Sequence, residues 1–352
     1  MATPYASESF LHQLLGKALA ASASDIHLKV GQPPGARVRG DMVYFRVDKI
    51  REEDTEAVAK IILARQSTIR EQPIDTLSEH DTSYAVAGLG RFRVNIYKQR
   101  GSLAIVMRSI PITIPTFEEL GIPAAVATLA EHDRGLVLVV GAAGNGKSST
   151  LAAMIGHINA TMAKHIVTIE DPIEFLHEDN RSSVSQREVG IDTGNFASAL
   201  RAALRQDPDV ILVGEIRDEE TMEIALQAAE TGHLVVSTVH TPDVSRTVNR
   251  LLALNKGTGD FRERIADCLQ GIIAQRLLPK RDGSGVCLAA ELLVVTGTVR
   301  EALKRPDSNP SLKELMEKGV SPYGMQTFEM HLKQLVAQGV LAKDVARAAA
   351  TF

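Results

Sequence analysis

One stretch, residues 134–150, limits what this chain can fold into more than any other part of the sequence. The five apolar residues Leu136 to Val140 predict a short buried strand. The next eight residues, Gly141 to Ser148, read GAAGNGKS and match the pattern G-x-x-x-x-G-K-[ST] at every fixed position. A helix pattern, ending in LAAMIGHINA, follows directly. A strand, a glycine-rich turn and a helix in this order are the context that a phosphate-binding loop requires.

The residue types of this loop explain how it would hold a phosphate. Glycines let backbone N–H groups converge on an anion without Cβ clashes, and the helix N-terminus adds partial positive charge. In such loops the lysine, here Lys147, reaches the β- and γ-phosphates, and the hydroxyl, here Ser148, ligates Mg²⁺. ATP and Mg²⁺ are therefore the expected ligands. The predicted phosphate-binding residues are Gly141, Gly144, Asn145, Gly146, Lys147, Ser148 and Ser149.

Length and composition exclude several other classes of protein. The 352 residues suffice for two ordinary domains, and the net charge of −4 offers no cationic face, so no nucleic-acid partner is expected. Cys268 and Cys287 lack metal-ligand spacing and are expected to be free thiols. No apolar run approaches the roughly 20 residues of a membrane helix, and the apolar patch after Glu8 lacks a basic leader. We therefore expect a cytoplasmic protein.

The first third of the chain predicts a small α+β domain over residues 1–110. Apolar residues at helical spacing predict helices near 10–19 and 53–70, whereas alternating patterns predict strands at 25–30, 82–86, 91–98 and 103–108, with a hairpin in 36–47. Three prolines mark 111–123 as a linker. One helix is predicted over 118–130, and residues 124–352 are assigned to the catalytic domain.

In that second domain, strands alternate with helices, which predicts a parallel sheet covered on both faces. The predicted strands after the loop are 165–169, 209–213 and 233–240, and the predicted helices are 148–162, 196–205 and 221–230. Past Val248 the chain is expected to be mainly helical, with one hairpin joining 277 to 295 around Asp282 and Gly283. The predicted fold class is α/β.

Several charged residues stand where this fold would gather them around a nucleotide. Glu215 follows the apolar strand 209–213, so it is expected at the carboxyl edge of the sheet, where it suits the magnesium shell or polarises water. Glu170, Asp171 and Glu174 also follow a strand, and three carboxylates so close together repel one another unless a cation is near. The alternative is that they form a polar loop in which the aspartate caps a helix. His233 and His240 are seven residues apart, on opposite faces of an ideal strand, which disfavours a metal pair.

These motifs together resemble the pilus retraction (twitching motility) ATPases, the PilT and PilU group of the secretion ATPase superfamily. The resemblance covers nearly the whole chain. It is carried by ASDIHL (23–28) with GQPP (31–34), GRFRVN (90–95), TIEDPIE (168–174), QREV (186–189), DPDVILVGEIRD (207–218), ETGH (230–233), TVH (238–240) and GMQTF (324–328).

The resemblance implies a PAS-like N-terminal domain and a RecA-like ATPase domain with a helical C-terminal part. It also implies roles: Glu174 as the catalytic glutamate that positions water, Glu215 near Mg²⁺, and the P-loop lysine on phosphate. The residues implied to sense nucleotide or form an interface are His233, His240, Arg93, Arg108 and Arg217. Members form homohexameric rings that act on an inner-membrane pilus platform protein, which implies a cytoplasmic protein held at the inner face of that membrane.

Two segments differ from the usual family pattern and leave alternatives open. The loop carries Ala143 and Asn145, and the arm reads TVREALKR (298–305) where retraction ATPases usually have an AIRNLIR-like motif. The region SLKELM (311–316) is similar to the accessory PilU branch, which works beside a sister ATPase. The alternatives to a retraction motor are an accessory motor, a nucleotide-gated assembly protein with slow hydrolysis, and an extension or type II secretion ATPase. The last group usually carries a four-cysteine zinc motif, and this chain has only two cysteines.

Overall fold

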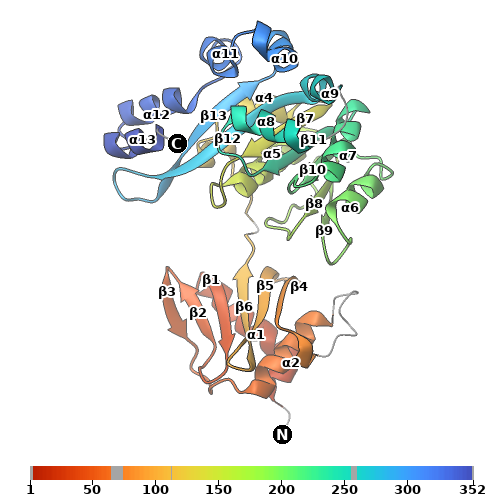
Figure 1. The fold of residues 1–352 in the computed structure, drawn as a ribbon. Coiled ribbons are helices and arrows are strands. Elements are labelled where there is room, and N and C mark those ends of the chain that lie inside the picture. The colour runs from red at the N-terminus through yellow and green to blue at the C-terminus, as the bar shows by residue number, and fades with distance from the viewer. Residues whose placement is uncertain (1–2, 65–73, 112, 255–259, 351–352) are drawn as a thin grey trace. The chain divides into compact units, whose positions relative to one another are not determined.

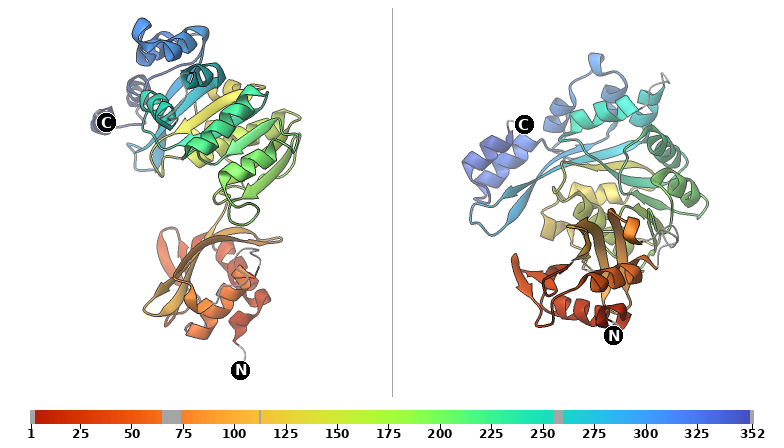
Figure 2. Two further views of the ribbon diagram at one scale, coloured as in Figure 1. Left: turned by 45° about the vertical axis from the view of Figure 1, so that its right-hand side comes forward. Right: turned by 60° about the horizontal axis from the view of Figure 1, so that its bottom comes forward.

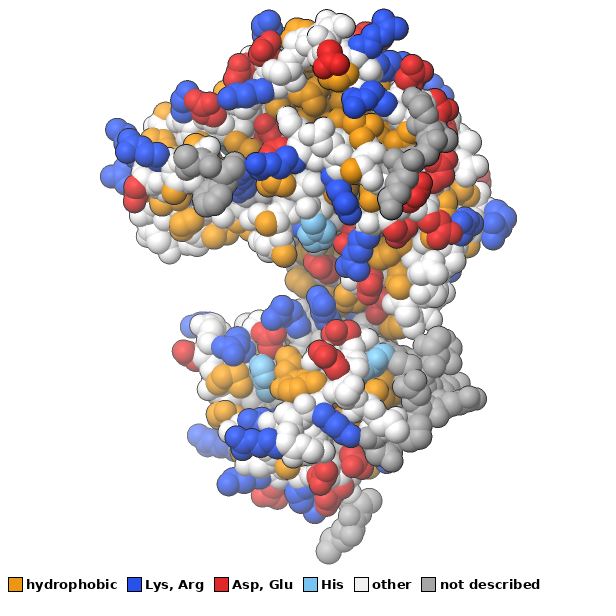
Figure 3. Space-filling view, viewed as in Figure 1, with side chains coloured by type: hydrophobic (Ala, Val, Ile, Leu, Met, Phe, Trp, Pro, Cys, Tyr) orange, Lys and Arg blue, Asp and Glu red, His pale blue; other side chains and the backbone are white. Residues whose placement is uncertain are grey.

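The computed structural model describes residues 3–64, 74–111, 113–254 and 260–350. The chain divides into two compact units. The first comprises Met1–Ile112 with the short segments Glu174–Leu176 and Gly190–Asp192, and the second comprises the rest of the chain. Within the described ranges, no helix combines the length and the apolar character needed to cross a membrane. Acidic and basic side chains are interspersed over the visible surface of both units (Figure 3).

The first unit is built on a six-stranded sheet in the order β3-β2-β1-β6-β5-β4, and every neighbouring pair is antiparallel (Figure 1). The predicted strands and the predicted hairpin are all present. Their bounds are β1 (Ala23–Lys29), β2 (Gly35–Val38), β3 (Asp41–Tyr44), β4 (Glu79–Val86), β5 (Gly90–Gln99) and β6 (Ser102–Ser109). Arg39 and Gly40 both have positive φ in the turn that joins β2 to β3.

Helices α1 (Glu8–Ala20) and α2 (Glu52–Leu63) cover one face of this sheet (Figure 2). Leu11 and Leu15 of α1 belong to the same buried cluster as the core-facing strand residues Ile26 and Ile105. Because strand side chains alternate, the other residues of the same strands form the opposite, polar face of the sheet. The predicted helix 53–70 is confirmed as far as Leu63, and residues 65–70 lie outside the described residues.

The segment that precedes the strand of the phosphate-binding loop contains two short helices, so the prediction of one helix over 118–130 is wrong. They are α3 (Phe117–Leu120) and α4 (Ala125–Ala130). The reason is local: Gly121 ends α3 in the left-handed region, with φ +66°, and Pro123 follows it. The hydroxyl of Thr116 caps α3 by accepting from Glu119 N at 3.2 Å.

The second unit contains a seven-stranded sheet in the order β13-β12-β7-β11-β10-β8-β9. All neighbouring pairs are parallel except β12 and β13. The strands are β7 (Gly135–Val140), β8 (His165–Glu170), β9 (Ser183–Glu188), β10 (Val210–Val213), β11 (Leu234–Val239), β12 (Leu269–Pro279) and β13 (Val286–Val294).

Helices pack on both faces of this sheet, as predicted for an alternating strand and helix pattern (Figures 1 and 2). They are α5 (Lys147–Thr161), α6 (Phe196–Ala203), α7 (Glu219–Glu230), α8 (Val244–Leu254) and α9 (Phe261–Cys268). The C-terminal part adds α10 (Gly297–Lys304), α11 (Leu312–Lys318), α12 (Phe328–Ala337) and α13 (Lys343–Ala350).

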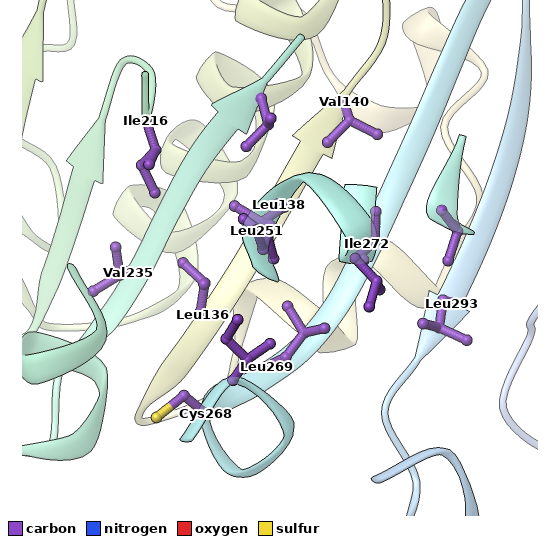
Figure 4. Packing of buried hydrophobic residues seen from close by; sticks show 14 of the residues in the cluster. Leu136, Leu138, Val140, Ile216, Val235, Leu251, Cys268, Leu269, Ile272 and Leu293 are labelled. Atoms are coloured by element: carbon purple, nitrogen blue, oxygen red, sulfur yellow. The ribbon is translucent and has the colours of Figure 1, made fainter. Parts of the chain in front are cut away.

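Strand β7 shows why both faces must be covered. Leu136, Leu138 and Val140 point into the cluster formed with α7, α8 and α9, to which Leu251 of α8 also belongs (Figure 4). The intervening Val137 and Val139 point into the second cluster, formed with α4 and α5. Each side chain is fully buried, which stabilises the fold by roughly 1.5–3 kcal/mol per residue.

Two strands differ from the sequence prediction. Strand β12 begins at Leu269 and lies parallel to β7, so the expectation of a mainly helical region with a hairpin from 277 is wrong in its extent. Apart from Gln270, its first half is apolar, and periodicity alone does not distinguish such a run from a buried helix. Strand β9 was not predicted, because it is an edge strand in which five of the six residues are polar.

Candidate functional site

The glycine-rich loop takes the conformation that its pattern predicts. Gly144 and Gly146 have φ values of +79° and +77°, and α5 begins at Lys147 directly after Gly146. The first N–H groups of a helix have no acceptor within that helix, so those of Lys147, Ser148 and Ser149 point out of the N-terminus of α5. A 15-residue helix also places the positive end of its dipole there. This arrangement is an anion-binding site built from backbone groups.

The loop lysine is held inside this turn. Lys147 is 8% exposed, and its Nζ donates to Gly141 O and Ala142 O, both at 2.9 Å. Its charge is therefore kept against the loop that the phosphates would occupy. The side chain of Asn145 is bonded to β12 instead, because its Oδ1 accepts from Leu277 N at 3.1 Å.

Besides β7, which leads into the loop, strands β11, β10 and β8 end at the same edge of the sheet. In the parallel register, Val140 pairs with Val239, Val213 pairs with Ser237, and Ile169 pairs with Val213. The residues that follow these strands therefore emerge at one level. The four strands bring together Gly141, His240, Gly214 with Glu215, and Glu170 at this carboxyl edge.

Glu215 is the buried carboxylate of this edge, at 8% exposure. One oxygen, Oε1, forms an ion pair with Arg217. The other, Oε2, makes no hydrogen bond with any described residue, although His240 Nε2 lies 3.4 Å away. Strand β11 braces the segment, since Ile216 N donates to Thr238 O at 3.0 Å. A buried carboxylate oxygen without a hydrogen bond is costly, and it suits a cation or a water that joins the site with its ligand.

Residues Glu170 and Glu174 of the predicted acidic cluster belong to different units of the structure. Glu170 stays at the sheet edge, where its Oε1 accepts from Thr168 Oγ1 at 2.7 Å and from Gln186 Nε2 at 3.0 Å. Glu174 is exposed and lies in the segment Glu174–Leu176, which groups with the first unit. Its assignment as the water-positioning residue stays a prediction.

The two histidines lie at opposite edges of the sheet. His240 follows β11 at the carboxyl edge beside Glu215, and it is 53% exposed. His233 precedes β11 at the amino edge, where its Nδ1 lies 2.9 Å from Ala228 O and 3.3 Å from Thr231 Oγ1. Within this unit, the sheet therefore joins His240 to the P-loop edge but does not join His233 to it.

The first unit places its predicted arginines side by side. Arg93 on β5 is the direct antiparallel partner of Arg108 on β6, which in turn pairs with Asp25 on β1. Arg108 Nε donates to Asp25 Oδ1 at 2.8 Å. Burial raises the pKa of Asp25, but hydrogen bonds from Ser24 and Arg108 outweigh it and hold that pKa below its usual value. Both arginines lie on the polar face of the sheet.

Fold and site together define a P-loop nucleotide-binding protein of the RecA-like α/β class. The loop strand β7 is separated from the Glu215 strand β10 by β11, and the buried lysine, the helix N-terminus and the buried carboxylate share one edge. The family model for type II/IV secretion system proteins matches residues 5–319. This chain belongs to that family.

Several individual proteins are similar to this chain along almost its full length. The type IV pilus retraction ATPase PilT of Pseudomonas aeruginosa is 41% identical over 337 residues, which cover 95% of this chain and 96% of that protein. The type IV pilus ATPase PilU of the same organism is 37% identical, over 96% of this chain and 87% of that protein. A crystal structure of the pilus retraction motor PilT with bound ADP has a TM-score of 0.86 at 42% identity, covering 97% of this chain and 96% of that one.

Sequence reasoning did not single out two residues that the structure brings to the site. Glu170 was considered only as one member of an acidic cluster, although its position at the end of a predicted strand is the kind of signal that also identified Glu215. Gln275 is 1% exposed on β12, and its Nε2 donates to Thr150 Oγ1 of α5 at 2.7 Å. Nothing local marks Gln275, since only the pairing of β12 with β7 brings it there.

Proposed function

We propose that this protein is an ATPase motor that couples ATP hydrolysis to the retraction of type IV pili. One observation carries the proposal: the buried Lys147 and the buried Glu215 carboxylate lie at the same edge of a RecA-like sheet. The near-full-length identity to a pilus retraction ATPase supports the biological context. Hydrolysis needs a cation on the phosphates and a carboxylate near the attacking water, and this edge offers both groups.

Mg²⁺ fits the oxygen donors of this edge. The hydroxyl of Ser148 and the carboxylate of Glu215 are the residues that would hold it, and hard divalent cations prefer oxygen ligands. The buried Glu215 Oε2, which has no hydrogen bond among the described residues, supports this assignment. When bound, the ion would neutralise charge on the phosphate oxygens. Lys147 would bind the β- and γ-phosphates, and the α5 N–H groups would orient them.

The remaining predicted residues act around the γ-phosphate in this proposal. Glu174 positions the attacking water, and Arg93 with Arg108 supplies positive charge to the transition state. His240 and His233 sense the nucleotide, and Arg217 contributes to a subunit interface. The cross-strand pairing of Arg93 with Arg108 supports joint action on one anion, because two adjacent guanidinium groups match several phosphate oxygens.

The proposed working form is a homohexamer at the inner face of the inner membrane. It would act on a pilus platform protein there and would operate with a sister pilus ATPase. The second candidate is an accessory motor of the PilU type. The 37% identity to PilU over 96% of this chain and the sequence of residues 311–316 favour that alternative.

Steady-state ATP hydrolysis by the purified protein tests the proposal, with the mass of the oligomer measured in the same sample. We expect a hexamer that hydrolyses ATP, and a loss of at least about 100-fold in both Lys147→Ala and Glu174→Gln. Glu174→Gln should still bind ATP. Turnover that survives Lys147→Ala would refute the site assignment. A hexamer that binds ATP without turnover would favour the accessory or nucleotide-gated role, and a sister ATPase would then be added to the assay.

A further inference from the structure

Strand β12 extends beyond the neighbour that pairs with its inner edge. It pairs with β7 only from Leu269 to Ala274, whereas its pairing with β13 on the other side continues to Pro279. Among the residues that the structure describes, the backbone of β12 that faces β7 therefore has no strand partner past Ala274. Buried strand edges need acceptors for their N–H groups, so another part of the chain must supply them.

The phosphate loop supplies one of these acceptors. Asn145 Oδ1 accepts from Leu277 N at 3.1 Å, as a carbonyl of a longer β7 would do. Leu277 also packs on the loop, since a Cβ added at Gly146 would lie 3.6 Å from its Cδ1. The contact is made by the Asn145 side chain, so it depends on the residue type at this position of the loop.

A second residue of the same β12 segment, Gln275, contacts the start of the loop and the helix that follows it. A Cβ added at Gly141 would lie 2.6 Å from Gln275 O, which shows how closely the two backbones approach. The side chain of Gln275 reaches forward to Thr150 in α5, at 2.7 Å. The segment Gln275–Leu277 thus contacts the start of the loop, its middle and the helix that follows it.

We propose that Asn145 is a positioning residue that fastens the phosphate loop to β12 and couples nucleotide binding to the β12–β13 hairpin. This inference rests on the proposed nucleotide-binding function. A loop fixed before the ligand arrives loses less conformational freedom on binding, so the tether favours nucleotide affinity. Coupling is reciprocal, so a bound nucleotide also stabilises the hairpin.

The hairpin is connected to α12 because its second strand is hydrogen-bonded to α12 and to the segment just before it. Ala290 N of β13 donates to the buried His331 Nδ1 of α12 at 2.9 Å. Gln326, just before α12, donates from its Nε2 to Ala290 O at 2.9 Å. A path of hydrogen bonds therefore joins the loop to α12, through the Asn145 side chain, the β12–β13 pairing and the His331 side chain.

Hydrogen exchange of the full-length protein, with and without ADP, tests this proposal. Asn145→Ala should speed exchange in residues 275–279 by about 5-fold without nucleotide, because the Leu277 N–H loses its acceptor. It should also weaken ADP affinity by about 3- to 10-fold. Asn145→Asp keeps an acceptor oxygen, so it should protect the segment like wild type while its negative charge weakens ADP binding. Asn309→Ala, which removes a side chain bonded to backbone elsewhere in this unit, should change neither quantity.

The opposite results separate this inference from the function on which it rests. If Asn145→Ala weakens ADP binding but leaves exchange in 275–279 unchanged without nucleotide, Asn145 touches phosphate directly and the tether is refuted. Faster exchange with unchanged ADP affinity would refute the coupling. A wild-type protein that binds no nucleotide would refute the proposed function, and faster exchange in Asn145→Ala would still establish the tether itself.

Discussion

Arg93 and Arg108 face each other directly across strands β5 and β6 of the first unit. Like charges at paired positions of a sheet repel each other, so such a pair is unfavourable unless an anion compensates it. Asp25 compensates one of them, through the 2.8 Å contact to Arg108 Nε. The pair therefore presents positive charge on the polar face of the sheet, as a site for phosphate oxygens requires.

Replacing both arginines tests whether this charge serves the nucleotide. The double variant Arg93→Ala with Arg108→Ala should lower ATP turnover by at least about 10-fold, because transition-state charge loses two donors. Oligomer mass should stay close to wild type, whereas the melting temperature should fall, because the buried Asp25 loses its hydrogen bond from Arg108. Arg37→Ala is the matched control: Arg37 pairs with Asp25 from the other side, on β2, and should retain turnover. Unchanged turnover in the double variant would make the pair ordinary surface residues.

Glu215 should be essential for turnover but not for binding. Gln has nearly the same shape as Glu, so Glu215→Gln should preserve the fold. It removes the negative charge at Oε2, which makes no hydrogen bond with the described residues. We expect ATP hydrolysis to fall by about 100-fold or more, and the concentration of Mg²⁺ needed for half-maximal activity to rise. ATP binding measured without Mg²⁺ should be nearly unchanged. A variant with normal Mg²⁺ dependence would remove Glu215 from the proposed metal shell.

Two loop glycines provide a test of backbone spacing. Gly141 and Gly144 both have positive φ, but an added Cβ would collide with Gln275 O only at Gly141, whereas it meets nothing within 4 Å at Gly144. Gly141→Ala should therefore lower the free energy of unfolding by about 2 kcal/mol or more, and Gly144→Ala by only about 1 kcal/mol. Thermal or urea unfolding of both variants measures the difference. An equal loss of unfolding free energy in the two variants would mean that the β12 backbone shifts at little cost to accommodate the added Cβ at Gly141.

Glu291 should make the stability of the second unit depend on pH. It is 8% exposed on β13, its Oε2 accepts from Val244 N at 2.9 Å, and burial raises its pKa, with a further contribution from Asp243. The folded state then holds the proton more tightly than the unfolded state, so stability is lost as pH rises from the ordinary glutamate pKa through the raised one. Glu291→Gln keeps the acceptor but cannot ionise. Its melting temperature relative to wild type should rise between pH 4 and pH 8.

A control of opposite sign is available on α12. The hydrogen bond from Lys333 to Glu329 lowers the pKa of Glu329, so its contribution is present above the ordinary pKa and is lost as pH falls. Glu329→Gln should therefore lose melting temperature relative to wild type at pH 8 and not at pH 4. If Glu291→Gln follows the same direction as this control, burial does not dominate the titration of Glu291.

Local patterns in the sequence were sufficient for the loop and for most elements. The order of glycines, Lys147 and Ser148 predicted a turn at the start of a helix, and the structure has that turn with α5 beginning at Lys147. The apolar residues Val210 to Val213 predicted a buried strand, and the structure has β10 there. These features depend on neighbouring residues, so a local pattern contains the information.

Long-range pairing decided what those patterns left open. The run from Leu269 to Ala274 became a central strand because β7 offered an unpaired edge, and no residue of the run itself signals that partner. The same pairing set Gln275 and Leu277 beside the phosphate loop. His233 and His240 show that closeness in sequence does not ensure closeness in space. They flank the single strand β11, so they lie at opposite edges of the sheet.

The sequence by itself determined the chemistry of the phosphate loop, the types of most elements and the family resemblance. Each of these is encoded by residue type and short spacing, because backbone conformation and helix or strand periodicity are local properties. Only the tertiary structure decided which strands are neighbours, and so which side chains meet: Arg93 with Arg108, Glu215 with His240, and Asn145 with Leu277. Those contacts join residues 15 to 132 positions apart, and their formation depends on the burial and pairing of whole strands rather than on any short segment.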